Sequence, residues 1–101
     1  MAAYWYRIYV MGDRPGSRRA VANLRALCEA SVPGDYELEV VDVLHQPDRA
    51  EVAKIMATPT VIKLSPPPRR RVVGDLSDGR LAVNALDLPE PAGGGEEAGR
   101  P

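Results

Sequence analysis

The chain has 101 residues, a formal net charge of −1 and one cysteine, Cys28. We expect a single domain, because domains typically span roughly 100 to 150 residues. The balanced charge argues against most nucleic-acid binding, and one cysteine cannot form an internal disulfide. No window approaches the ~18 apolar residues of a membrane span, and no basic stretch followed by an apolar one opens the chain. We therefore expect a cytoplasmic protein without nucleic-acid or membrane partners.

The first half of the chain predicts a strand, a helix and a second strand. Residues 4–11 are mostly aromatic or β-branched with only Arg7 charged, which favours a buried strand. After a break at residues 12–16, Ser17 is the candidate N-cap of a helix in which apolar residues recur at helical spacing. A strand over residues 36–44 then completes a βαβ unit, whose two strands pair in parallel.

The second half predicts a short helix, a hairpin and a segment with an ambiguous pattern. Pro47 opens a helix that should reach about Met56, and residues 60–64 and 70–73 form strands joined by three prolines. After Ser77, residues 81, 83 and 85 alternate as in a strand, whereas residues 76, 82, 83 and 86 suit a helix capped by Ser77. Residues 89–101 lack apolar bulk and predict a disordered tail after a domain spanning residues 1–88.

No residue pattern points to catalysis. Thr58-Pro59-Thr60 resembles the turn of thioredoxin-like folds, where the proline is cis and faces a reactive thiol, but the turn at residues 12–17 holds no cysteine. Cys28 lies on the apolar helix face, where burial keeps a thiol inert; an oxidoreductase using Cys28 alone is the enzymatic alternative. His45 is the sole histidine, and no two carboxylates are spaced as an acid and base pair. We expect no catalytic residue, metal or cofactor.

The basic residues of the hairpin allow two interpretations. Arg69, Arg70 and Arg71, together with Lys63, predict a basic edge. Such a cluster is usually a solvated face or a guard against edge-to-edge aggregation, and the functional alternative is a contact with an acidic surface of a partner protein. Lys54 on the second helix is likewise either a surface lysine or a binding residue.

Several short motifs, taken in chain order, closely resemble the KaiB family of clock proteins. The motifs are Tyr9-Val10 with Gly12, Val41-Asp42-Val43-Leu44, Pro47, Lys54-Ile55, Ala57-Thr58-Pro59-Thr60, Lys63, Pro66-Pro67-Pro68, Arg70-Arg71, Gly74-Asp75-Leu76-Ser77 and Leu86-Asp87-Leu88. Each piece is weak alone, but their joint spacing over residues 4–88 is highly specific.

This resemblance implies an α/β, thioredoxin-like fold of order βαβαββα and a non-enzymatic adaptor that binds the ring-shaped ATPase KaiC. A KaiA-like protein and a histidine kinase with a similar domain are the further partners that it implies. The family is also metamorphic: the alternative architecture is a ground state of order βαββααβ, which assembles as an oligomer, a tetramer in the family, and does not bind KaiC. The alternative function is a thioredoxin-like module that contacts a histidine kinase or a stress regulator independently of a clock.

The family pattern also implies roles for individual residues. The partner contacts are Lys54, Lys63, Arg70 and Arg71, with Arg19 as a weaker one, and the fold-switch residues are Pro59, Ala85 and Asp87. The family usually has glycine at the position of Ala85, and alanine is favoured in a helix interior by roughly 0.8 to 1 kcal/mol, about a fivefold shift in a balanced equilibrium. We therefore expect the thioredoxin-like state to be favoured, although Gly79 near the start of the same helix opposes this slightly.

Overall fold

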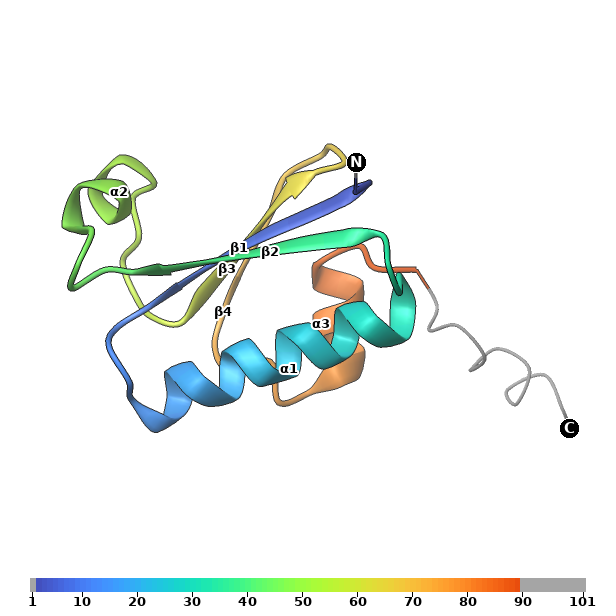
Figure 1. Cartoon of the computed structure of the whole chain (residues 1–101), viewed down its shortest axis with the longest axis horizontal. Coiled ribbons are helices and arrows are strands. Elements are labelled where there is room, and N and C mark those ends of the chain that lie inside the picture. The colour runs from blue at the N-terminus through green and yellow to red at the C-terminus, as the bar shows by residue number, and fades with distance from the viewer. Residues whose placement is uncertain (1, 90–101) are drawn as a thin grey trace, which may run out of the picture.

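The computed structural model describes residues 2–89, which form a four-stranded sheet and three helices (Figure 1). The order is the expected βαβαββα, and the segment with the ambiguous pattern is a helix. Of the predicted tail, residues 90–101 lie outside the described residues. No helix among those described is long and apolar enough to cross a membrane. The elements are β1 (Tyr4–Val10), α1 (Pro15–Ser31), β2 (Tyr36–Asp42), α2 (Pro47–Val52), β3 (Thr60–Ser65), β4 (Arg70–Val73) and α3 (Gly79–Ala85).

The sheet has the strand order β2-β1-β3-β4. β1 pairs in parallel with β2, from Tyr4 opposite Tyr36 to Val10 opposite Asp42, which confirms the predicted βαβ unit. On its other side β1 pairs antiparallel with β3, and β3 pairs antiparallel with β4. The hairpin with a proline-rich loop is thus also confirmed.

The two faces of the sheet are covered unequally. α1 and α3 lie on one side of the sheet and α2 on the other (Figure 1). The main core forms on the α1 and α3 side, where Tyr6 and Ile8 of β1 pack with Leu24 of α1 and Leu86 after α3. The smaller cluster on the α2 side centres on Tyr9, Val41 and Ile62. α2 has only six residues and none of them is buried, so much of this face stays open.

The caps of α1 and α3 differ from those predicted. α1 begins at Pro15 with Arg14 as its N-cap, because proline suits the first helical position, where its missing N–H is not needed. Ser17 is therefore inside the helix, and its Oγ accepts a hydrogen bond from the Met11 N–H (3.3 Å). At α3, Asp78 replaces the predicted Ser77, since its Oδ1 accepts from the Leu81 N–H (3.2 Å).

β2 and α2 both end earlier than predicted. β2 ends at Asp42, whose Oδ1 accepts from the backbone N–H groups of Gly12 (3.1 Å) and Leu44 (2.9 Å). These bonds turn the chain, so residues 43 and 44 leave the strand. α2 ends at Val52 and not near Met56, and Lys54 beyond it has a left-handed backbone (φ 57°), which cannot continue a helix.

In the two-state equilibrium that the family resemblance implies, replacing Ala85 by glycine is expected to favour the βαββααβ form, by up to about fivefold. Ala85 is the exposed last residue of α3, so the change removes no core contact and acts through helix propensity alone. The effect of a terminal position is smaller than that of an interior one. Populations measured by NMR on the parent and on Ala85→Gly would check this, and βαββααβ signals dominating in the parent would contradict it.

Candidate partner-binding surface

The strand alternation of the hairpin divides its basic residues between the two faces of the sheet. Ile62 pairs with Arg71, and Lys63 pairs with Arg70. Because successive side chains of a strand point to opposite faces, Arg71 shares the α2 side with Ile62, while Arg70 shares the α1 and α3 side with Lys63. The predicted single basic edge is therefore two separate sites.

On the α2 side, the guanidinium of Arg71 joins β4 to the end of α2. Its Nη1 donates to the Lys54 carbonyl (3.0 Å) and its Nη2 to the Ala53 carbonyl (2.6 Å). Lys54 and Arg71, 17 positions apart in the sequence, thus lie side by side. They line a groove of about 550 Å³, called the basic groove below. Its residues are Arg7, Tyr9, Asp48, Arg49, Val52, Ala53, Lys54, Ile62, Leu64, Arg69 and Arg71.

Part of the charge in the basic groove is neutralised within the chain. The carboxylate of Glu39 accepts from Arg7 Nε (2.7 Å) and from Arg49 Nη1 (2.9 Å). These bonds, Arg49 first and then Arg7, hold the pKa of the Glu39 carboxyl below its usual value. Among the ion pairs of residues 2–89, none involves Lys54, Arg69 or Arg71. Asp48 is the one carboxylate that lines the groove, so these three cations leave its rim with a net positive charge.

Exposed apolar side chains accompany these cations. Val52, which lines the groove, is 83% exposed, and Met56, which follows α2, is 92% exposed. Large apolar side chains at such exposure, next to unpaired cations, have the composition of a surface that binds another protein.

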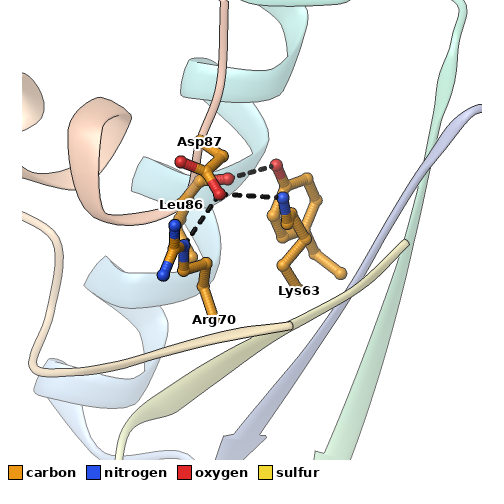
Figure 2. A network of polar contacts seen from close by, with 5 residues as sticks. Lys63, Arg70, Leu86 and Asp87 are labelled. Atoms are coloured by element: carbon orange, nitrogen blue, oxygen red, sulfur yellow. Dashed lines mark hydrogen bonds and ion pairs between the residues drawn. The ribbon is translucent and has the colours of Figure 1, made fainter. Parts of the chain in front are cut away.

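On the opposite face, Lys63 and Arg70 both bind Asp87 (Figure 2). Lys63 Nζ lies 3.0 Å and Arg70 Nε 2.8 Å from Asp87 Oδ2. The two bonds, Arg70 first, hold the pKa of the Asp87 carboxyl below its usual value. Lys63 is only 2% exposed, so its predicted place on a solvated basic edge is wrong. Lys63, Arg70 and Asp87 are called the carboxylate clasp below.

Next to the carboxylate clasp, the hydroxyl of Tyr6 donates to the carbonyl of Leu86 (3.0 Å) in the buried core. The residues just after α3 are thus held by β1, β3 and β4 together, through Tyr6, Lys63 and Arg70.

Comparison with known proteins assigns the chain to a family. The model of the KaiB domain matches residues 7–88. The chain belongs to the KaiB family. Over 85 residues it is 49% identical to the circadian clock oscillator protein KaiB of Prochlorococcus marinus strain MIT 9312, covering 84% of this chain and 81% of that protein. It is also 49% identical to the protein of the same name from Synechococcus sp. strain RCC307, covering 84% and 77%.

Solved structures show that this KaiB-family chain has a thioredoxin-like fold. The N-terminal domain of Synechococcus elongatus SasA superimposes with a TM-score of 0.67 at 24% identity, covering 83% of this chain and 80% of that domain. Chloroplastic thioredoxin z superimposes with a TM-score of 0.68 at 18% identity, covering 96% and 80%.

The remaining predicted residues of this KaiB-family chain lie apart from both sites. Arg19 is on α1, and its Nε donates to Asp75 Oδ2 (3.2 Å). Pro59, in the loop that leads into β3, follows a cis peptide bond. Cys28 is fully buried, as predicted, and burial raises the pKa of its thiol to about 12. His45 Nδ1 lies 3.1 Å from Asp42 Oδ2 on the surface. No cluster of metal ligands occurs among residues 2–89.

Sequence reasoning missed the pairing of Glu39 with Arg7 and Arg49 and the place of Asp87 in the carboxylate clasp. The first depends on three separate elements, so no local signal existed. A signal for the second was present: Lys63 has the same strand parity as the buried Val61, and residues of one parity face the core together. A lysine at such a position needs an anion nearby.

Proposed function

We propose that this KaiB-family chain is a non-enzymatic adaptor that binds a KaiC-type ring ATPase and modulates its phosphorylation or signalling output in circadian, other timed or stress regulation. Its relatives in Prochlorococcus and Synechococcus are named circadian clock oscillator proteins, which supports the clock role. The observation that carries the binding role is the basic groove, where Lys54 and Arg71 meet beside exposed apolar side chains.

The geometry of the basic groove suits a protein ligand. Arg71 donates hydrogen bonds to two backbone carbonyls. These bonds hold the guanidinium in a fixed position and do not neutralise its charge. A fixed cation loses less side-chain entropy when it meets a partner's carboxylate than a free one does. Val52 and Met56 add apolar area that a partner would remove from water. We therefore expect an acidic partner surface with apolar residues.

Catalysis by the thioredoxin-like fold is not part of the proposal. Thiol chemistry needs a thiolate near the first helix terminus, and Cys28 lies well inside α1 with no exposed surface. Its raised pKa leaves almost no thiolate near neutral pH. Insulin reduction by the parent and by Cys28→Ser should therefore show no difference.

Charge reversal at Lys54 or Arg71 is expected to weaken binding to the host's KaiC homologue by about tenfold or more, because each change replaces attraction by repulsion in the basic groove. Pull-down followed by titration calorimetry would measure this on Lys54→Glu and Arg71→Glu. Arg80→Glu is the matched control, since Arg80 is an exposed arginine on α3, on the far side of the sheet. Equal binding by all four proteins would remove the basic groove as the contact.

The alternative function differs in the partner and uses the same groove. A module that contacts a histidine kinase or a stress regulator outside a clock would need the same kind of docking surface. The similarity in fold to the SasA domain supports this alternative function. Co-purification from the host discriminates between them. Recovery of a kinase or regulator without a KaiC-type ATPase would favour the alternative, and recovery of a KaiA-like protein together with the ATPase would favour the clock.

A further inference from the structure

The sheet face on the α2 side is covered at one end only. Figure 1 shows α2 beside one end of the strands, while the start of β1 lies at the other end. Trp5 is the second residue of β1 and is 40% exposed. Because Tyr6 and Ile8 of this strand face the main core, strand alternation directs Trp5 to the α2 side. A large apolar side chain therefore lies on a part of the sheet that α2 leaves open.

The ring of Trp5 is held in place by its neighbour Arg7. The central guanidinium carbon of Arg7 lies 5.8 Å from the centre of the Trp5 ring, which is within the range of a cation–π contact. Arg7 is itself fixed, since its Nε lies 2.7 Å from Glu39 Oε1. A single exposed apolar side chain is ordinary on a protein surface, but one that is already ordered loses less entropy when a partner covers it.

The same arginine connects Trp5 to the basic groove. Arg7 lines this groove together with Tyr9, Ile62 and Leu64, which belong to the apolar cluster on the α2 side. Tyr9, Arg7 and Trp5 follow one another on one face of β1, so Trp5 continues the surface of the groove away from α2. The basic groove and Trp5 are thus one continuous surface.

Charge divides this surface across the strands. On β2, one edge of the sheet, Glu37 is the register partner of Trp5 and is exposed. On β4, the other edge, Arg71 is the register partner of Ile62 and has Lys54 beside it. Among the ion pairs of residues 2–89, none involves Glu37, Lys54 or Arg71. An apolar middle therefore lies between a negative and a positive edge.

We propose that a protein partner packs an apolar side chain on Trp5, places a carboxylate toward Arg71 and Lys54, and places a basic group toward Glu37. This inference rests on the proposed function and gives its partner a defined polarity across the strands. A second copy of this chain fits this surface less well, because cations outnumber carboxylates in the lining of the basic groove, and two such grooves would repel each other.

Replacing Trp5 by threonine tests the apolar contact, because threonine keeps the strand preference and removes the ring. We expect the affinity for the host's KaiC homologue, measured by titration calorimetry, to fall about tenfold or more, as is typical of a tryptophan at the centre of an interface. The fall should be equal at low and high salt, since the contact is apolar. Lys54→Gln should instead weaken binding mainly at low salt.

Two variants control for effects other than the loss of the ring. Trp5→Phe keeps an aromatic ring and should retain most of the affinity. Leu81→Thr is the matched control, since Leu81 is 66% exposed on α3, on the other side of the sheet, and its replacement should leave binding unchanged. Circular dichroism checks the folds, and Trp5→Val replaces threonine should that variant unfold.

The polarity is tested at the β2 edge. Glu37→Lys should weaken binding by about twofold to fivefold at low salt, because it places a cation opposite the partner's basic group. Glu29→Lys, which reverses an exposed carboxylate on α1, is the matched control and should bind like the parent. Glu37→Lys that binds as tightly as the parent, or more tightly, overturns the proposed polarity.

Hydroxyl-radical footprinting tests the contact in the unchanged chain. Trp5 is the single tryptophan of the sequence, so its oxidation is assigned without ambiguity. We expect its oxidation rate to fall to less than half in the complex, while that of Leu81 stays the same. Equal oxidation of Trp5 in the free and bound chains overturns the inference. Protection of Trp5 that grows with the concentration of the chain alone also overturns it, because a second copy is then the occupant.

The outcomes separate this inference from the proposed function. Where the parent binds the KaiC homologue, Lys54→Glu does not, and Trp5→Thr binds like the parent, the inference fails and the proposed function stands. Where the parent itself does not bind the homologue, both fail.

Discussion

Replacing Leu86 by alanine is expected to lower the free energy of unfolding by about 2 to 5 kcal/mol. Leu86 is fully buried and packs in the main core with Tyr6, Leu24 and Ala82. The loss combines the transfer free energy of the deleted carbons with the cavity that the rigid sheet cannot fill. The free energy of unfolding of a domain is only about 5 to 15 kcal/mol, so this loss is a large fraction of the total stability. Urea denaturation followed by circular dichroism would measure it.

Leu81 is the matched control, since it is also a leucine of the α3 segment. Its side chain is 66% exposed, so Leu81→Ala should change the free energy of unfolding by no more than about 0.5 kcal/mol. Similar losses in the two variants would show that Leu86 does not anchor α3 to the sheet. Hydrogen exchange on Leu86→Ala should also show faster exchange in α3 than in β1, because the deleted contacts join the helix to the sheet.

These leucines also show why the sequence alone left the segment after Ser77 undecided. Apolar residues there alternate as in a strand at positions 81, 83 and 85, and they also fit the spacing of a helix. No local feature of the sequence favours one pattern over the other. The structure resolves this by tertiary contact: as a helix the segment buries Ala82 and, just beyond its end, Leu86, while Leu81 remains in solvent. The choice depends on the sheet that receives these side chains, and Tyr6 of β1, which contacts Leu86, is 80 positions away in the sequence.

The strands were easier to predict, because hydrophobic runs of strand length are local. β1, the βαβ unit and the hairpin follow from composition and proline placement, and the structure confirms them. Strand and helix ends were harder, since they depend on side chains that satisfy particular backbone groups. Asp42 ends β2 by accepting from Gly12, which belongs to the loop between β1 and α1, and Asp78 begins α3 in place of its neighbour Ser77.

The candidate site was predicted as a set of residues but not as an arrangement. Lys54, Arg70 and Arg71 stand out as basic residues, and strand parity separates Arg70 from Arg71. What the sequence does not contain is the position of α2, which brings the Lys54 carbonyl to the Arg71 guanidinium. The position of Asp87 against the hairpin is likewise a product of how α3 packs.

Replacing Tyr6 by phenylalanine is expected to lower the free energy of unfolding by about 1 to 3 kcal/mol, although it removes only one oxygen atom. The Tyr6 hydroxyl donates to the Leu86 carbonyl (3.0 Å), one of the last carbonyls of the α3 segment, which a helix cannot satisfy by itself. Burial raises the Tyr6 pKa well above its usual value, so the hydroxyl keeps its proton and remains a donor near neutral pH. Without this donor, the buried carbonyl has lost its partner.

Tyr36→Phe distinguishes this effect from the general loss of a tyrosine hydroxyl. The Tyr36 hydroxyl donates to Glu29 Oε2 (2.6 Å) on the surface, where water can replace it, so its removal should cost clearly less. Urea denaturation of both variants would give the two values. The Tyr6 bond and the carboxylate clasp hold adjacent residues. Tyr6→Phe should therefore also increase acetylation of the buried Lys63 by acetic anhydride, measured relative to acetylation of the exposed Lys54. A destabilised Tyr6→Phe protein in which Lys63 stays protected would show that the end of α3 is held by the clasp alone.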